Sequence, residues 1–170
     1  MMASNSILNG TPNLSVRSAK QQDMKAVFQM IKELAEWEKM SHKLRLDEEQ
    51  LTKDFINKAF HSLVVEAEDR SLVGYAIYNI DYSTWEGKSL ILVDLFIKEK
   101  YRGKKIGEQL FISVMKAGDA QGCQKAYFHV LSWNPAIKFY KRLGCTDGSP
   151  YLVYRLEHDN FKKLVNTSKL

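Results

Sequence analysis

One run of eight residues limits what this chain can fold into. Leu90 to Ile97 is apolar at every position except Asp94. A strand with one solvated face would carry polar residues at every second position, so this run predicts a central strand that is covered on both faces. A carboxylate in such a strand is either a buried acceptor for backbone donors or a functional group.

Helix and strand periodicities alternate before this run. A first strand is predicted at residues 14–17, followed by a helix whose apolar positions run from Met24 to Leu34 after a capping pattern of Ser18 and Gln21. Asp47 with Gln50 predicts the start of a second helix. Strands over 62–67 and 73–82, separated by a polar turn, should form an antiparallel hairpin.

After the run, the pattern predicts a basic turn, a helix from Ile106 to about Gln121, a strand over 125–131, a short helix over 134–143 ended by Gly144, and a last strand over 151–156. The predicted order is β-α-α-β-β-β-α-β-α-β. This order predicts an α/β (α+β) fold, a mixed sheet with helices on both faces.

Length and composition predict a single domain. The chain has 170 residues, of which 45% are hydrophobic, enough for a core over residues 14–170 after a flexible tail at 1–13. No apolar run approaches the roughly 20 residues of a membrane span, and two cysteines suit a cytoplasmic protein. The net charge of +5 favours anionic partners, but no motif for nucleic-acid binding accompanies it.

Two segments carry candidate chemistry. Arg102-Gly103-Lys104-Lys105-Ile106-Gly107 joins the apolar strand to a helix, so that helix amides and three cations could hold a diphosphate. An ordinary basic turn explains the same residues equally well. In the second segment, residues 133–144, Tyr140 lies at helical spacing from apolar neighbours, which is also typical of a core tyrosine.

Together the two segments resemble the GNAT superfamily of acyl-CoA-dependent N-acyltransferases. Arg102 and Gly107 match its Arg/Gln-x-x-Gly-x-Gly/Ala signature, and a later signature of Asn, Phe-Tyr and Gly is matched by residues 134, 139, 140 and 144. Residues 34–39, 74–78, 82–85, 101–103 and 139–142 look like the subgroup of diamine (spermidine/spermine) and thialysine acetyltransferases. The resemblance implies a mixed, mostly antiparallel sheet, a homodimer, and transfer of acetyl from acetyl-CoA to a small primary amine, without a metal.

The resemblance also implies roles for individual residues. The backbone of Leu95, Phe96 and Ile97 would pair with pantetheine, and Arg102, Gly103, Lys104, Lys105, Ile106 and Gly107 would hold the diphosphate. Asn134 and Ala136 would line the cofactor, and Tyr140 would lie beside its sulfur as the catalytic acid. The amine pocket would use Trp37, Glu38, Tyr127, Phe128 and His129.

The sequence departs from the subgroup at positions that matter for catalysis. Val93 and Leu152 replace two acidic residues, and Lys105 replaces the first glycine of the signature. Candidates for the general base are then Asp94, Glu38 and His129, and a β-bulge near Val93 would re-aim Asp94. The alternatives to a small-amine enzyme are a protein or peptide N-acetyltransferase and a catalytically degenerate acyl-CoA-binding protein.

Overall fold

The structure, a computed structural model of the chain, describes residues 6–7, 14–148 and 153–167. The chain divides after His129 into two compact units. Within the described residues, the first unit contains a sheet with three α-helices, and the second contains two α-helices. The expectation of one domain over residues 14–170 stays a prediction.

The first unit is built on a six-stranded sheet in the order β1-β2-β3-β4-β5-β6. Neighbouring strands are antiparallel, except that β5 and β6 are parallel. This confirms the mixed, mostly antiparallel sheet. The strands are β1 (Ser6–Ile7), β2 (Ser15–Ser18), β3 (His61–Glu66), β4 (Leu72–Ser83), β5 (Gly87–Ile97) and β6 (Lys125–Phe128).

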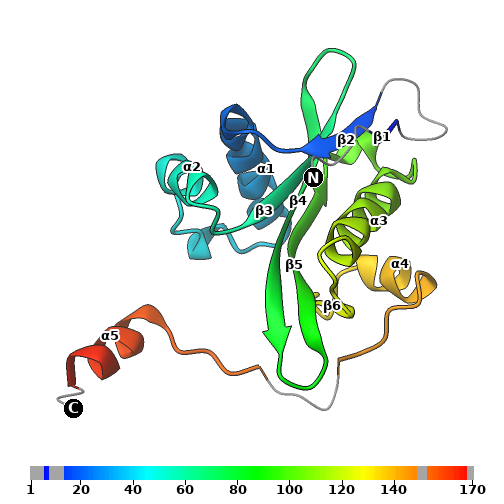
Figure 1. Cartoon of the computed structure of the whole chain (residues 1–170). Coiled ribbons are helices and arrows are strands. Elements are labelled where there is room, and N and C mark those ends of the chain that lie inside the picture. The colour runs from blue at the N-terminus through cyan, green and yellow to red at the C-terminus, as the bar shows by residue number, and fades with distance from the viewer. Residues whose placement is uncertain (1–5, 8–13, 149–152, 168–170) are drawn as a thin grey trace. The chain divides into compact units, whose positions relative to one another are not determined.

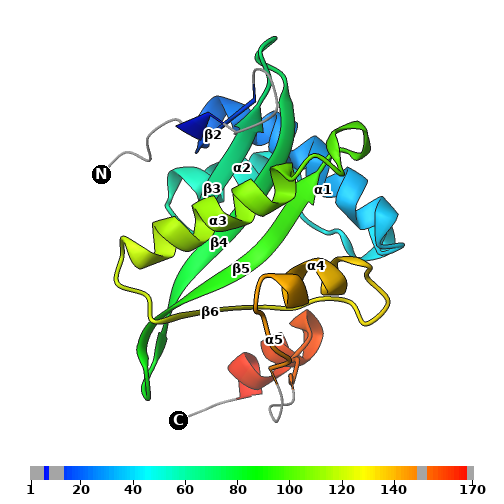
Figure 2. The ribbon, with the colours of Figure 1, turned by 90° about the vertical axis from the view of Figure 1, so that its right-hand side faces the viewer.

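Helices cover both faces of this sheet. Helices α1 (Met24–Trp37) and α2 (Glu48–Ile56) lie on one face, and α3 (Ile106–Asp119) lies on the other (Figures 1 and 2). Buried side chains of α1 and α2 pack with Val64, Tyr75 and Phe96 on the first face. On the second face, a Cβ added at Gly118 of α3 would lie 2.7 Å from a terminal methyl of Leu90, so that side chain would have to shift to admit a larger residue.

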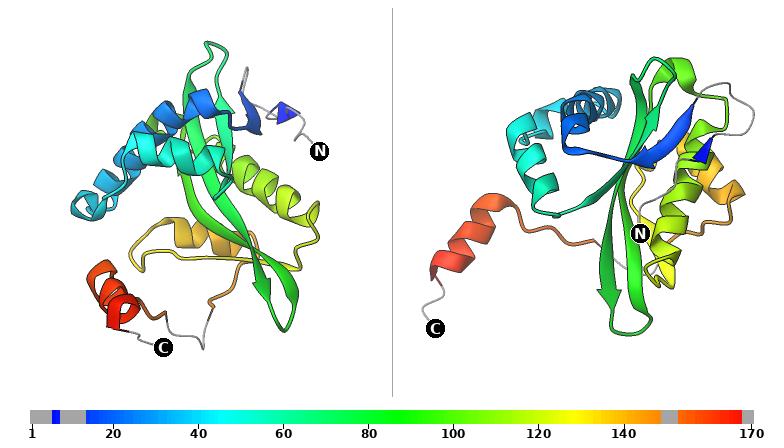
Figure 3. Two further views of the ribbon diagram at one scale, coloured as in Figure 1. Left: turned by 60° about the vertical axis from the view of Figure 1, so that its left-hand side comes forward. Right: turned by 45° about the horizontal axis from the view of Figure 1, so that its top comes forward.

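The long apolar run forms the inner part of β5, between β4 and β6. Phe96 belongs to the core under α1 and α2. Leu95 and Ile97 lie beneath Gly107 of α3, on the opposite face. The expectation of a strand covered on both faces is therefore confirmed, and Figure 3 shows helices on either side of it.

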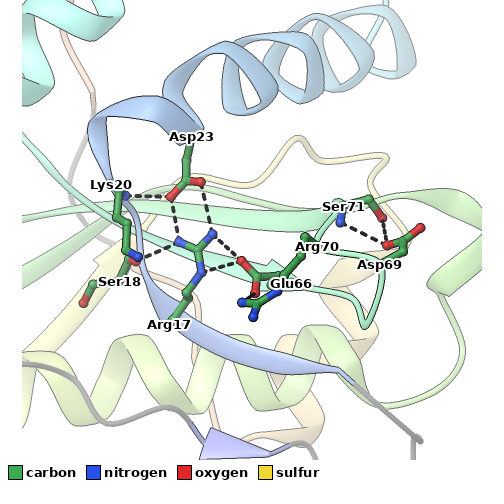
Figure 4. A network of polar contacts seen from close by, with 8 residues as sticks. All are labelled: Arg17, Ser18, Lys20, Asp23, Glu66, Asp69, Arg70 and Ser71. Carbon is green, nitrogen blue, oxygen red and sulfur yellow. Dashed lines mark hydrogen bonds and ion pairs between the residues drawn. The ribbon is translucent and has the colours of Figure 1, made fainter.

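Helix α1 begins differently from the prediction. A short 3-10 helix over Gln21–Asp23 precedes it, and the carboxylate of Asp23, not Ser18, caps the start by accepting the N–H of Lys20 at 2.7 Å. Asp23 also binds the guanidinium of Arg17, which reaches Glu66 of β3 as well (Figure 4). The capping prediction at Ser18 was wrong because the first helical turn starts after Lys20, whose N–H is accepted by Asp23. At α2 the prediction was right, since Gln50 N–H donates to Asp47 at 2.8 Å.

The ends of the chain differ most from expectation. Ser6 and Ile7, within the expected tail, pair with β2. The last predicted strand was wrong where it is described, because residues 153–156 form no strand, and residues 151–152 lie outside the described residues. A helix that was not predicted, α5 (His158–Thr167), follows. The strand predicted over 125–131 already ends at Phe128.

Candidate active site

A β-bulge in β5 decides where Asp94 points. Ile77 of β4 pairs with Asp94, but the next residue, Tyr78, pairs with Leu92, so Val93 is an extra residue without a partner on β4. Leu92 and Asp94 would share a face in a regular strand. The extra residue instead puts Asp94 on the face of Phe96 and Tyr75, under α1.

On that face, Asp94 has a buried hydroxyl as its partner. The Tyr75 side chain is fully buried, and its hydroxyl donates to Asp94 Oδ2 at 3.2 Å. Burial and the nearby charge of Asp94 raise the pKa of Tyr75 well above its ordinary value, so the phenol stays protonated and remains a donor. Sequence reasoning missed Tyr75, because the bulge in β5 decides that Tyr75 and Asp94 lie on the same face of the sheet.

Glu38 lies close enough to Asp94 for its pKa to respond to the charge of Asp94. Burial raises the pKa of Asp94, while the hydrogen bond from Tyr75 acts in the opposite direction. Burial, and then the charge of Asp94, raise the pKa of Glu38 at the end of α1. Two partly desolvated carboxylates whose charges interact can bind a cation. Either of them is a candidate for the base that removes a proton from the substrate. Val93 is half exposed and carries no proton acceptor.

The edge of β5 beside this pair is open. Strand β4 pairs with β5 as far as Ile97, whereas β6 pairs with it only from Ser89 to Leu92. No described strand therefore occupies the other edge from Val93 to Ile97. Backbone groups along such an edge can pair with an extended amide-containing ligand, so this edge fits the pantetheine arm.

The turn after β5 has the geometry of an anion site. Gly103 and Lys105 both have positive φ, at 76° and 60°, and α3 starts at Ile106. The N–H of Gln109 makes the bond to the Lys105 carbonyl, so the amides before it project from the end of the helix. Gly103, Lys104 and Lys105 are exposed, and their charges and backbone fit a diphosphate.

Gly107 leaves space that the protein itself does not fill. A Cβ at this position would meet Ile97 and Leu95 at 3.7 and 3.9 Å, which are ordinary contacts. The packing of α3 on β5 therefore does not require glycine here. Close approach of a ligand to the helix start supplies a reason for it.

Arg102 is turned toward the sheet and α1. Its Nε donates to the carbonyl of Ile97 at 2.8 Å. Its guanidinium lies 5.6 Å from the ring centroid of Trp37 and 5.5 Å from that of Phe96. Trp37 is the last residue of α1 and precedes Glu38. The structure thus brings Arg102 to the amine-pocket candidates.

The candidates on β6 divide between the two faces of the sheet. Phe128 packs edge-on against Phe111 of α3 at 5.9 Å, on the face opposite Asp94, because it pairs with Leu92. Tyr127 points the other way, and its hydroxyl donates to Asp81 of β4. The structure therefore separates Phe128 from the carboxylate pair. His129 is exposed and follows the end of β6.

The remaining candidates lie in the second unit. Asn134 Oδ1 accepts the N–H of Ala136 at 2.8 Å, which starts α4 (Ala136–Arg142). Gly144 follows this helix with a φ of 87° and ends it as predicted. Tyr140 packs against Phe139 at 4.9 Å, and burial raises the pKa of Tyr140 to about 12. Its phenol therefore stays protonated near neutral pH and can donate a proton.

Two features are absent from the described residues. Among them, no three His, Cys, Asp or Glu side chains are grouped so that they could hold a metal ion. Within the same residues, no helix has the length and apolar character needed to cross a membrane.

Comparisons with known proteins identify the family of the chain. Residues 25–145 match the model of the Acetyltransferase (GNAT) family. A thialysine N-epsilon-acetyltransferase of Mus musculus is 35% identical over 162 residues, covering 88% of this chain and 95% of its own. A spermidine/spermine N(1)-acetyltransferase-like protein 1 of Homo sapiens is 29% identical over 89% of this chain, but only 23% of its own length is covered.

Solved structures share the fold. An integron cassette protein of V. cholerae superposes with a TM-score of 0.74 at 22% identity, over 92% of this chain and all of its own. An aminoglycoside N-acetyltransferase in complex with CoA gives a TM-score of 0.71 at 17% identity, over 89% of this chain and 99% of its own. The chain belongs to the GNAT family of acetyltransferases and is an N-acetyltransferase.

Proposed function

We propose that this N-acetyltransferase transfers the acetyl group of acetyl-CoA to a primary amine of a small cationic molecule, of the thialysine or polyamine class. The observation that carries the proposal is the pair of partly buried carboxylates, Glu38 and Asp94, beside the open edge of β5. Such a pair attracts an ammonium group. Relatives named for thialysine and spermidine/spermine support the same class of acceptor.

Acetyl-CoA supplies an activated acetyl thioester. The turn at residues 103–107, exposed from Gly103 to Lys105, would hold its diphosphate. The free edge of β5 would bind its pantetheine amides. An amide N–H of β5, such as that of Leu95 or Phe96, would donate to the thioester oxygen as negative charge develops there.

The carboxylate pair would remove the proton that keeps the amine unreactive. An alkylamine with a pKa near 10.4 is free in only about one molecule in a thousand at neutral pH, equivalent to roughly 4 kcal/mol. The raised pKa values of Asp94 and Glu38 narrow the gap to the pKa of the ammonium. Tyr140, protonated at neutral pH, would return a proton to the departing thiolate.

A panel of acceptors tests the proposal. Purified protein and acetyl-CoA are combined with putrescine, spermidine, spermine, thialysine, lysine, arylalkylamines and a lysine-containing peptide, and release of coenzyme A is measured. We expect turnover on small aliphatic amines. Faster acetylation of the peptide than of every small amine would make the protein a peptide acetyltransferase, and cofactor binding without turnover would make it a degenerate acyl-CoA-binding protein.

Variants of the pair sharpen this test. Asp94→Asn and Glu38→Gln should each lower kcat/KM for the amine, by about 10² or more if the residue is the general base. Glu36→Gln is the matched control, because Glu36 is an exposed glutamate on the same helix. Full activity in both Asp94→Asn and Glu38→Gln would remove the carboxylate pair from the mechanism.

We also propose a cytoplasmic homodimer. Val153, Tyr154 and Leu156 are exposed at 63%, 89% and 52%, and a second copy would cover such apolar side chains. The two cysteines are unpaired, as suits a reducing compartment. Sedimentation at micromolar concentration that shows only a monomer would contradict the dimer, and fractionation of a tagged protein checks the compartment.

A further inference from the structure

The side chain of Arg102, an exposed residue, makes three contacts within the first unit. Its Nε donates to the carbonyl of Ile97 at 2.8 Å, and its guanidinium lies over the rings of Trp37 and Phe96. Both centroid distances, 5.6 and 5.5 Å, are within the range of cation–π attraction. A planar guanidinium can make these contacts together, whereas the compact ammonium of lysine lacks both the planar group and its Nε donor.

These contacts direct Arg102 away from a simple role as a diphosphate ligand. Lys104 and Lys105 are exposed within the same turn and supply cationic charge there. Arg102 instead joins the beginning of the turn to the end of β5 and the end of α1. The position of Arg102 therefore links the turn at residues 102–107 to the end of α1, where Trp37 precedes Glu38.

One link leads from Arg102 to Glu38. Trp37 is the last residue of α1, and Glu38 follows it as the C-cap, with its N–H bonded to the carbonyl of Leu34 at 2.9 Å. Holding the indole of Trp37 against Arg102 fixes this helix end. The orientation of the Glu38 carboxylate then depends on the contact between Trp37 and Arg102.

The other link leads from Arg102 to Asp94. The guanidinium lies over Phe96, and the ring of Phe96 packs against that of Tyr75 with centroids 6.1 Å apart. Tyr75 in turn donates its hydroxyl to Asp94. Arg102 thus contacts Trp37, which precedes Glu38, and Phe96, which packs on the partner of Asp94.

We propose that Arg102 is a positioning residue that couples the cofactor turn to the amine seat by holding Trp37 and Phe96 in place. This inference rests on the proposed function of Glu38 and Asp94 as the amine seat. Coenzyme A bound at the turn would restrain Arg102 and, through Trp37, order Glu38. Because coupling between two binding sites is reciprocal, the amine would also strengthen the binding of coenzyme A.

A double-mutant cycle in enzyme kinetics tests the coupling. Arg102→Lys keeps the charge and loses the planar stack, and Trp37→Leu removes the other partner. We expect each variant to raise the KM for the amine about tenfold, while the Kd of acetyl-CoA measured in the absence of amine stays within about threefold of wild type. The double variant should also show about a tenfold increase, because both changes remove one contact.

The opposite results would overturn the proposal. An Arg102→Lys variant with an unchanged amine KM would mean that Arg102 acts through its charge alone. A double variant with an approximately hundredfold effect would show that the two residues act independently. Arg102→Gln serves as the charge control, since a purely electrostatic role predicts a larger loss of acetyl-CoA binding in this variant than in Arg102→Lys.

A second readout does not depend on turnover. Trp85→Phe combined with Trp133→Phe leaves Trp37 as the only tryptophan of the chain, which has three. Coenzyme A should change the fluorescence of Trp37, and Arg102→Lys should abolish this change while calorimetry gives a similar Kd. An unchanged response in Arg102→Lys would overturn the coupling. If the wild type acetylates no amine but Trp37 responds through Arg102, the proposed acceptor class fails and the coupling stands.

Discussion

Replacing Lys105 by glycine should stabilise the protein. Lys105 has a φ of 60° and a ψ of 8°, the left-handed conformation, immediately before α3. A residue with a Cβ pays about 1–2 kcal/mol in this region, whereas glycine adopts it freely. Glycine also increases the entropy of the unfolded chain, which offsets about 0.4–1 kcal/mol of the gain. We therefore expect Lys105→Gly to add about 1 kcal/mol to the free energy of unfolding.

Thermal and urea unfolding of the protein without ligand measure this gain. For a chain of this size, about 1 kcal/mol raises Tm by roughly 2–4 °C. The urea midpoint should rise with an unchanged m-value, because the surface exposed on unfolding stays the same. Lys58→Gly is the matched control, since Lys58 is also an exposed lysine with positive φ, at 58°. It should give a similar gain.

The two variants should differ in their affinity for acetyl-CoA. Lys105 lies in the proposed diphosphate turn, so Lys105→Gly removes one cation there and should weaken binding by a few-fold, which calorimetry measures. Lys58→Gly should leave the affinity unchanged. The reasoning about backbone strain is refuted if Lys105→Gly lowers Tm while Lys58→Gly raises it, because the same φ would then have opposite effects.

Four further predictions concern other residues. Asp94→Asn should raise Tm at pH 8, because a raised pKa means that the ionised form of Asp94 opposes folding. The gain in Tm should shrink as the pH falls through the raised pKa, because Asp94 of the wild type is then protonated. Tyr140→Phe should lower kcat by about 10²- to 10⁴-fold and change stability by no more than about 1 kcal/mol, as rate measurements and unfolding check. Burial raises the pKa of Asp23, but the ion pair with Arg17 outweighs burial, and the net pKa is lowered. Asp23→Asn should therefore lower the free energy of unfolding by about 2 kcal/mol at pH 7. This difference should vanish as the pH falls through the lowered pKa of Asp23. Gly107→Glu should abolish coenzyme A binding in calorimetry, while Gly107→Ala, which the packing accommodates, should fold normally.

Local periodicity was sufficient to predict most of the first unit. The doubly apolar run became β5, and the Asp47 cap starts α2 as its side chain suggested. These features depend on residues close together in the sequence. The cap at Asp23 could not be predicted in the same way, because Asp23 is held by Arg17, which also binds Glu66 of β3.

The candidate site was predicted unevenly for the same reason. The turn at residues 102–107 has a recognisable signature, and Gly103 and Lys105 within it have positive φ. The role of Arg102 could not be read from that signature, since its contacts with Trp37 and Phe96 join three separate elements. Phe128 was assigned to the amine pocket before the pairing of β5 with β6 was known. Phe128 pairs with Leu92, which puts its side chain on the face covered by α3, opposite Asp94.

The bulge at Val93 explains how the site can work without the glutamate that the subgroup carries there. Because Val93 is the extra residue, Asp94 takes the inward position beside Tyr75 and interacts with the charge of Glu38. Burial raises the pKa of Asp94. An arriving ammonium would favour the ionised carboxylates, and proton transfer from the amine to the pair then cancels opposite charges within a desolvated site. In the proposed mechanism, Glu38 at the end of α1 would then supply the second carboxylate beside Asp94, and Trp37 would hold that helix end in place.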